Sequence, residues 1–212
     1  MTGKIKINRK AKKIILGVCI GGVIVLTAGL FTYIHIADTN TLGRKISIYG
    51  VDVSTMTAEK AEEKLLDAFR TRKVQFKEDG TDVYETTLSG LGYDLDEEAL
   101  KTELTELQTK RESNRKLFAT QEDYKINYQI QKNEEQEKTA LSASNFGDKD
   151  RTASVDATVK YDDKQKKYVL IDDVQGNQID EARLLSYVDQ TLDDNFRLKL
   201  LGGDIQVTID TN

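Results

Sequence analysis

Proline and tryptophan are absent from this chain, and cysteine and histidine occur once each, as Cys19 and His35. Without tryptophan, a carbohydrate site built on indole stacking is excluded, and without proline the turns depend on Gly, Asn and Asp. Both Cys19 and His35 belong to one hydrophobic block near the start of the chain. Beyond that block there can be no disulfide, no Cys–His nucleophile and no zinc site built on His or Cys.

The residue types that remain do not form a recognisable catalytic motif. Ser47, Ser54 and Ser89 have no histidine to activate them and lie in no Gly-x-Ser-x-Gly elbow, so we interpret them as strand and turn residues. Acidic residues are plentiful, but none follow the spacing of a calcium-binding loop. We therefore expect no catalytic residue, no metal site and no cofactor, and the sequence assigns no ligand-binding residue.

Charge is distributed unevenly along the chain. Residues 38–212 carry 25 of the 31 basic residues and all 36 acidic ones, a formal charge of −11. A segment this acidic does not bind nucleic acid, anionic lipid or teichoic acid through bulk charge. We expect no nucleic-acid partner.

The longest hydrophobic run, Ile14 to Ala37, contains no Asp, Glu, Lys or Arg and follows six basic residues. As a helix, its cleanest stretch would be roughly 30 Å long, about the thickness of a bilayer core. The sequence predicts a cytoplasmic basic leader (1–13), a transmembrane helix (14–37) and an extracellular remainder. A cleaved signal peptide is the alternative, but its apolar core would be shorter and a cleavage motif would follow. Gly17 and Gly21 could pack two such helices together, although ordinary membrane-helix glycines are the favoured interpretation.

Hydrophobic periodicity divides the remainder into short helices and strands. We expect a linker (38–45), a strand broken by Gly50 (46–53), a helix capped by Thr57 (57–70), a hairpin (74–77 and 83–88) and a helix capped by Asp96. A loose polar stretch (108–123) would follow, then a strand (124–130), a helix (133–143), a hairpin (154–161 and 168–171), a helix (180–193) and a strand (205–209). Tyr124 and Tyr128 would share one face of their strand, which could stack on sugar rings but is more typical of a buried sheet face.

One pattern occurs twice. Gly92 and Gly176 are each followed by an aliphatic residue three positions later, then by Asp-Glu, and by Leu eight positions after the glycine. Each copy follows an expected hairpin and opens an expected helix, with Asp as the cap. The repeat predicts an α+β fold class: after the single transmembrane helix, two small tandem modules (46–112 and 113–212), each of antiparallel hairpins with helices packed on one side.

Three segments resemble a known family: Ile48 to Ala61 (IYGVDVSTMTAEKA), Leu88 to Asp96 (LSGLGYDLD) and Tyr168 to Asp180 (YVLIDDVQGNQID). They are similar, in the same order, to the peptidoglycan-binding (YoaR-like) region of Gram-positive membrane-anchored proteins. The chain departs from that pattern at Thr55, where the family has Gly, and at Ala58, where Pro is common. In the family this region precedes an L,D-transpeptidase domain with a Ser-His-Gly-Cys motif or a VanW-type domain, and neither is present here.

The resemblance implies a membrane-anchored module that faces the cell wall, with peptidoglycan and a cell-wall transpeptidase as partners. The expected function is non-catalytic peptidoglycan binding or spacing at the plasma membrane, with the N-terminus in the cytoplasm. Two alternatives remain: a protein–protein adaptor on the outer face of the membrane, or the N-terminal part of an L,D-transpeptidase.

Overall fold

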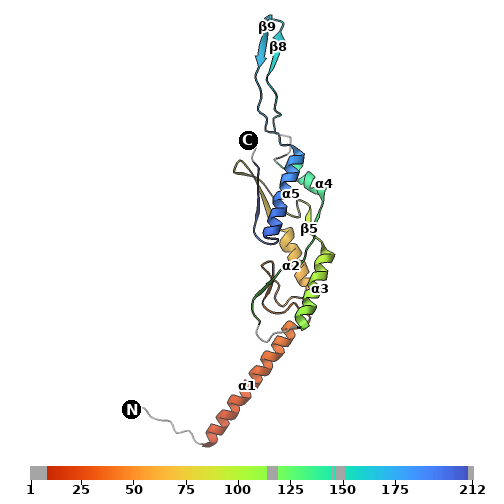
Figure 1. Cartoon of the computed structure of the whole chain (residues 1–212). Coiled ribbons are helices and arrows are strands. Elements are labelled where there is room, and N and C mark those ends of the chain that lie inside the picture. Colours follow the sequence, from red (N-terminus) through yellow and green to blue (C-terminus); the bar gives the residue numbers. More distant parts are fainter. Residues whose placement is uncertain (1–8, 114–118, 145, 147–150, 210–212) are drawn as a thin grey trace, which may run out of the picture.

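A computed structural model describes residues 9–113, 119–144, 146 and 151–209. The molecule is elongated, with a long helix at one end, a two-stranded hairpin at the other and the remaining elements between them (Figure 1). We call the intermediate part, the described residues 39–113, 119–144, 146 and 178–209, the folded body. Its fold class is α+β, as predicted.

The helix at the N-terminal end, α1 (Arg9–Asp38), contains a stretch from Gly17 to Ile36 that is long and apolar enough to span a membrane. None of that stretch is buried within the protein. Its large apolar side chains, including Val25, Leu26 and Phe31, are mostly exposed. Packing within the folded body therefore does not explain why this helix is apolar.

Next to α1, a three-stranded sheet has the order β2-β1-β6. The strands β1 (Ile46–Ile48) and β2 (Val51–Asp52) form an antiparallel hairpin that turns at Tyr49 and Gly50, both with positive φ. This turn confirms the predicted break in the strand at Gly50. The third strand, β6 (Glu122–Tyr124), pairs with β1 in parallel.

The centre of the folded body begins with α2 (Ala58–Arg70), which Thr57 caps by accepting a hydrogen bond from the Lys60 amide, as predicted. A second sheet has the order β10-β3-β4. The strands β3 (Lys73–Glu78) and β4 (Thr81–Thr87) form the predicted hairpin, which turns at Asp79 and Gly80. The strand β10 (Ile205–Ile209) adds in parallel to the other edge of β3.

A third, two-stranded sheet links β5 (Tyr93–Leu95) to β7 (Ile130–Lys132). The helix α3 (Glu97–Ser113) follows β5 and buries the predicted stripe of Leu100, Leu104 and Leu107. The helix α4 (Glu134–Ala143) begins at the cap Asn133 and follows β7.

The chain then forms the projecting hairpin of β8 (Thr158–Asp162) and β9 (Lys167–Ile171), and returns through α5 (Glu181–Leu198). Asp180 caps α5 as predicted, but the helix continues five residues beyond the predicted end at Asp193. Phe196 is buried in this extra part, against Phe69 and Tyr93. Burial of that ring explains why the helix extends past its acidic stretch.

The two tandem modules are not confirmed. Strands from the predicted second module complete the sheets of the first: β6 pairs with β1, β7 with β5, and β10 with β3. Buried side chains from Leu42 to Ile209 form one continuous core. The boundary expected between residues 112 and 113 therefore coincides with no division between sheets or cores.

The repeated glycine pattern has a local explanation. Asp96 and Asp180 both cap helices, accepting hydrogen bonds from the Ala99 and Arg183 amides at 2.8 Å. Only Gly92 has a positive φ, however. The hairpin before it lies within a three-stranded sheet, whereas β8 and β9 pair only with each other. The pattern therefore marks similar capping chemistry rather than a repeated architecture.

Two predictions between α3 and α4 were wrong. The stretch expected to be loose from Gln108 is helical up to Ser113, and residues 114–118 of it lie outside the described part. The strand expected over 124–130 is instead the end of β6, an irregular segment and the start of β7. Its alternating pattern reflects burial of Ile126 without strand pairing at that position.

Candidate functional site

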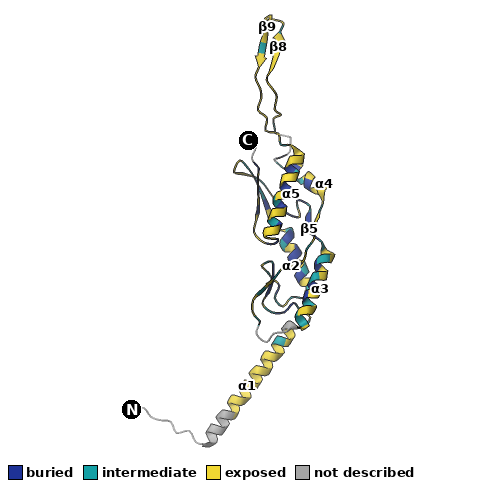
Figure 2. Cartoon of the chain, in the orientation of Figure 1, coloured by how far each residue is buried: buried dark blue, intermediate teal, exposed yellow. Residues whose placement is uncertain are grey.

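The projecting hairpin is the most exposed part of the chain beyond α1 (Figure 2). The register of β8 and β9 runs from Thr158 opposite Ile171 to Asp162 opposite Lys167. A single bridge between Val155 and Val174 continues that register toward the base. The two strands therefore extend well beyond the folded body, and none of the described strands pairs with either edge.

The two faces of the hairpin differ in chemistry. Residues directly opposite each other share a face, and successive residues alternate between faces. One face carries Val159, Tyr161, Tyr168 and Leu170 at its outer end and Val155 and Val174 at its base; we call it the apolar hairpin face. The other face carries Lys160, Asp162 and Lys167 together with Thr158, Val169 and Ile171.

No described part of the chain covers the apolar hairpin face. Val159 is 64% exposed, Leu170 is 63% exposed and Tyr168 is 74% exposed. The rings of Tyr161 and Tyr168 contact each other edge-to-face, with centroids 5.1 Å apart. Apart from that pair, aliphatic and aromatic surface that a sheet would normally bury lies open to its surroundings.

The base of the hairpin is fixed to the folded body by Arg151. Its guanidinium binds both carboxylate oxygens of Glu78 on β3, at 2.9 and 2.8 Å, and also donates to the Asn177 carbonyl. The Arg151 side chain is only 5% exposed and lies over the ring of Phe146. A bidentate, nearly buried ion pair of this kind sets the direction in which the hairpin leaves the body.

At the opposite end, the segment expected to be a linker is packed against the body. Leu42 and Gly43 are buried. The Leu42 amide donates to the Met56 carbonyl at 2.8 Å, and the Thr55 amide donates to the Gly43 carbonyl at 2.7 Å. These contacts join the first residues after α1 to the loop between β2 and α2.

Arg111 on α3 closes this junction. It donates to the Leu42 carbonyl at 2.7 Å and to Glu122 on β6 at 2.7 Å. It also donates to the Tyr124 hydroxyl at 2.9 Å, and its guanidinium carbon lies 5.5 Å from the centre of that ring. We call Arg111 and these partners the Arg111 clamp. Sequence patterns do not reveal this clamp, because Arg111 falls in the polar stretch (108–123) that they predict to be loose.

Inside the folded body, a charged cluster connects side chains from four elements: β5, β7, α4 and α5. Lys132 on β7 binds Glu137 on α4 at 2.7 Å and both carboxylate oxygens of Asp189 on α5, at 2.5 and 2.7 Å. The Tyr93 hydroxyl donates to Glu137 at 3.1 Å and to Asp189. Glu137 is 1% exposed.

The pKa values in this cluster follow from burial and pairing. Burial raises the pKa of Glu137 above its ordinary value. Burial and the hydrogen bond to Asp189 raise the pKa of Tyr93. Burial alone would lower the pKa of Lys132, but its bonds to Asp189 and Glu137 outweigh that effect and raise it. Both carboxylates are held by one lysine and Glu137 is shielded from solvent, so the cluster is suited to packing rather than to catalysis.

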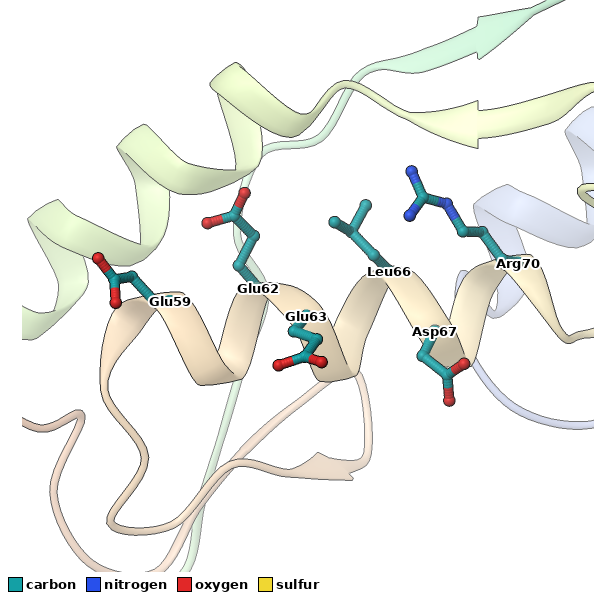
Figure 3. A pocket seen from close by; sticks show the side chains of 6 residues that line it. All are labelled: Glu59, Glu62, Glu63, Leu66, Asp67 and Arg70. Carbon is teal, nitrogen blue, oxygen red and sulfur yellow. The ribbon is translucent and has the colours of Figure 1, made fainter.

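A shallow depression of about 470 Å³ lies along α2 (Figure 3). Glu59, Glu62, Leu66 and Arg70 point to the side of α2 that faces α3 and β5, whereas Glu63 and Asp67 point away from it. Arg70 is already bound to Asp94 and Glu97 at 2.6 and 2.7 Å. The depression is open and acidic, and its one cation is engaged, so it has no feature that selects a ligand.

The remaining candidates do not gather into a site. Tyr124 and Tyr128 do not share a strand face: Tyr124 belongs to the Arg111 clamp, and Tyr128 packs edge-to-face on Tyr49, with ring centroids 5.9 Å apart. Ser47 donates to Asp123 at 2.6 Å, and Ser54 bonds the backbone of Ile46. In the part of the chain that the structure describes, no three Asp, Glu, His or Cys side chains come close enough to hold a metal ion.

Sequence patterns located the projecting hairpin but not its exposure. In β8, Val159 and Tyr161 alternate with polar residues, whereas Tyr168 to Ile171 in β9 is a continuous apolar run; both patterns predict a buried strand. Only the surrounding fold reveals that no described part of the chain covers the apolar hairpin face. The chain matches no known protein-family model, no curated protein and no solved structure.

Proposed function

We propose that this chain is a single-pass membrane protein whose folded body lies outside the cell and serves as a non-catalytic, wall-facing spacer. Residues 17–36 would cross the bilayer, and the basic leader would hold the N-terminus in the cytoplasm. The hairpin would then lie at the end of the molecule farthest from the membrane (Figure 1).

The observation that carries this proposal is the Arg111 clamp. A tethered domain on a free linker would sample many orientations and heights above a bilayer. Here the residues after α1 are instead bound to α3 and to the loop before α2. With Arg151 fixing the hairpin at the other end, the chain is suited to holding its far end at a defined distance from the membrane.

Peptidoglycan is the partner that the sequence resemblance supports, either as a bound ligand or as the layer against which the spacer works. The acidic character of residues 38–212 argues against teichoic acid and for a neutral or cationic contact. A transpeptidase acting on the same wall would be a natural neighbour. An adaptor that binds another exported protein is the second candidate, because the apolar hairpin face resembles a protein contact more than a sugar site.

Two experiments test the proposal separately. A tag behind Asn212 should be removed when protease is added to intact, wall-stripped cells, and a protected tag would show that the orientation is reversed. The full chain in detergent micelles should then sediment with purified peptidoglycan sacculi. Recovery entirely in the supernatant would contradict binding and would favour the adaptor.

A further inference from the structure

From the apolar hairpin face we infer that two copies of this chain in the same membrane pair through their hairpins, face to face. The inference rests on the membrane anchoring in the proposed function, but not on peptidoglycan binding. The hairpin is a two-stranded unit whose exposed apolar side chains are concentrated on one face, and no described part of the chain covers that face, whereas Val169 and Ile171 share the other face with Lys160, Asp162 and Lys167. Such a unit is marginal in water by itself, and a second hairpin supplies the missing layer.

The shape of the molecule allows this pairing. In Figure 1 the hairpin continues away from α1 along the length of the molecule, so its strands point away from the proposed membrane. Two copies related by a two-fold axis along the membrane normal would bring their hairpins together at the same height, with strands aligned. Aligned packing of two sheets is a favoured geometry, and a two-fold axis makes the same patch meet itself.

The charges on the hairpin limit the contact to its outer half. Asp172 follows Leu170 by two residues and falls between Leu170 and Val174, on the apolar side. Facing its counterpart in a second copy, it would be repelled. The contact we infer is therefore made by Val159, Tyr161, Tyr168 and Leu170, while Lys160 and Lys167 stay on the solvent side.

The area available explains why the pairing needs the membrane. Four side chains of this size and exposure offer on the order of 400–500 Å² per copy, below the roughly 800 Å² per partner of a standard interface. Two copies confined to one bilayer gain effective concentration from their anchors, which offsets a weak contact. The formal charge of −11 on residues 38–212 keeps the folded bodies apart. We therefore expect dimers in membranes and monomers after dilution into detergent.

Cysteine crosslinking of the full chain in membranes tests this inference. With Cys19→Ser as background, Val159→Cys places a thiol on the apolar hairpin face, and Lys160→Cys places one on the opposite face. A bismaleimide matched to the roughly 10 Å spacing of packed sheets should give several-fold more dimer from Val159→Cys than from Lys160→Cys. Adding Leu170→Lys should abolish the dimer, whereas adding Ile171→Lys on the other face should preserve it.

Other outcomes would overturn the inference. Equal crosslinking at both positions, no dimer at either, or a product whose mass shows a different protein would each exclude hairpin pairing between copies. A dimer that is lost on Gly17→Leu but kept on Leu170→Lys would assign association to the membrane helices instead. Labelling by a membrane-impermeant maleimide on wall-stripped cells separates this question from orientation: unlabelled Lys160→Cys would contradict the proposed topology, whatever the crosslinking result.

Discussion

Replacing Lys132 by methionine should destabilise the folded body by about 3 kcal/mol at pH 7, mostly because of Glu137. Removing one partner of a buried ion pair typically costs about 3–5 kcal/mol. Glu137 is 1% exposed and would lose its cation, whereas Asp189 is 41% exposed and would be compensated by water. The estimate therefore belongs at the lower end of that range.

Urea unfolding of the full chain in mild detergent, followed by far-UV circular dichroism, measures this loss. A change of about 3 kcal/mol moves the midpoint by about 1–3 M urea. The matched control is Lys138→Met, which removes an exposed pair with Glu181 at 3.1 Å and should change stability by less than about 1 kcal/mol. Equal losses in the two variants would refute the reasoning.

The pH dependence gives a second check on Lys132→Met. Burial already raises the pKa of Glu137 in the folded protein, and removal of Lys132 raises it further. The folded state then holds this proton more tightly than the unfolded state, so the stability of the variant falls as pH rises above about 4.3, the ordinary glutamate value. The difference in unfolding free energy between the wild type and Lys132→Met should therefore become smaller as the pH falls toward 4. Adding Glu137→Gln should restore more than half of it at pH 7, and a purely additive double variant would contradict the argument.

Three further outcomes are expected, each measured in the same detergent system. Gly92→Ala should lower the urea unfolding midpoint more than Gly80→Ala does. Both glycines have positive φ, but a Cβ at Gly92 would lie 2.8 Å from a backbone carbonyl oxygen, whereas a Cβ at Gly80 would have open space around it. Asp180→Ala should cost about 1 kcal/mol by removing the cap of α5, and no change in midpoint would refute that role. Arg111→Leu should speed trypsin cleavage between α1 and β1, while Thr109→Ala, which loses only a bond to its own helix, should not.

Local chemistry accounts for the elements that could be predicted from sequence. Thr57, Asn133 and Asp180 are cap residues at helix starts, and each accepts a hydrogen bond from an amide three residues later. The turns at Gly50 and Gly80 need positive φ, which glycine adopts readily. These caps and turns depend only on residues a few positions apart, so they can be recognised directly from the sequence.

The pairing of distant strands could not be predicted in this way. Ile205 at the start of β10 pairs with Val74 in β3, although the two residues are 131 positions apart in the sequence. Arg72 supports this arrangement by donating to the carbonyls of Lys199, Leu200 and Gly203 after α5. The periodicity of a strand does not identify its partner, so sequence patterns predict β3 and β10 in separate modules.

Exposure of the hairpin is a local property and not a sign of loose packing throughout the chain. In β10, Ile205 and Val207 are fully buried, and in β3 so are Val74 and Phe76. The chain thus covers the apolar faces of β3 and β10, even where the covering residues lie far away in sequence. In the hairpin, β8 has a similar alternating pattern and Arg151 holds the base, yet no described residue covers the apolar face. An apolar face that the chain positions but does not cover is best explained by a covering layer supplied from outside the chain.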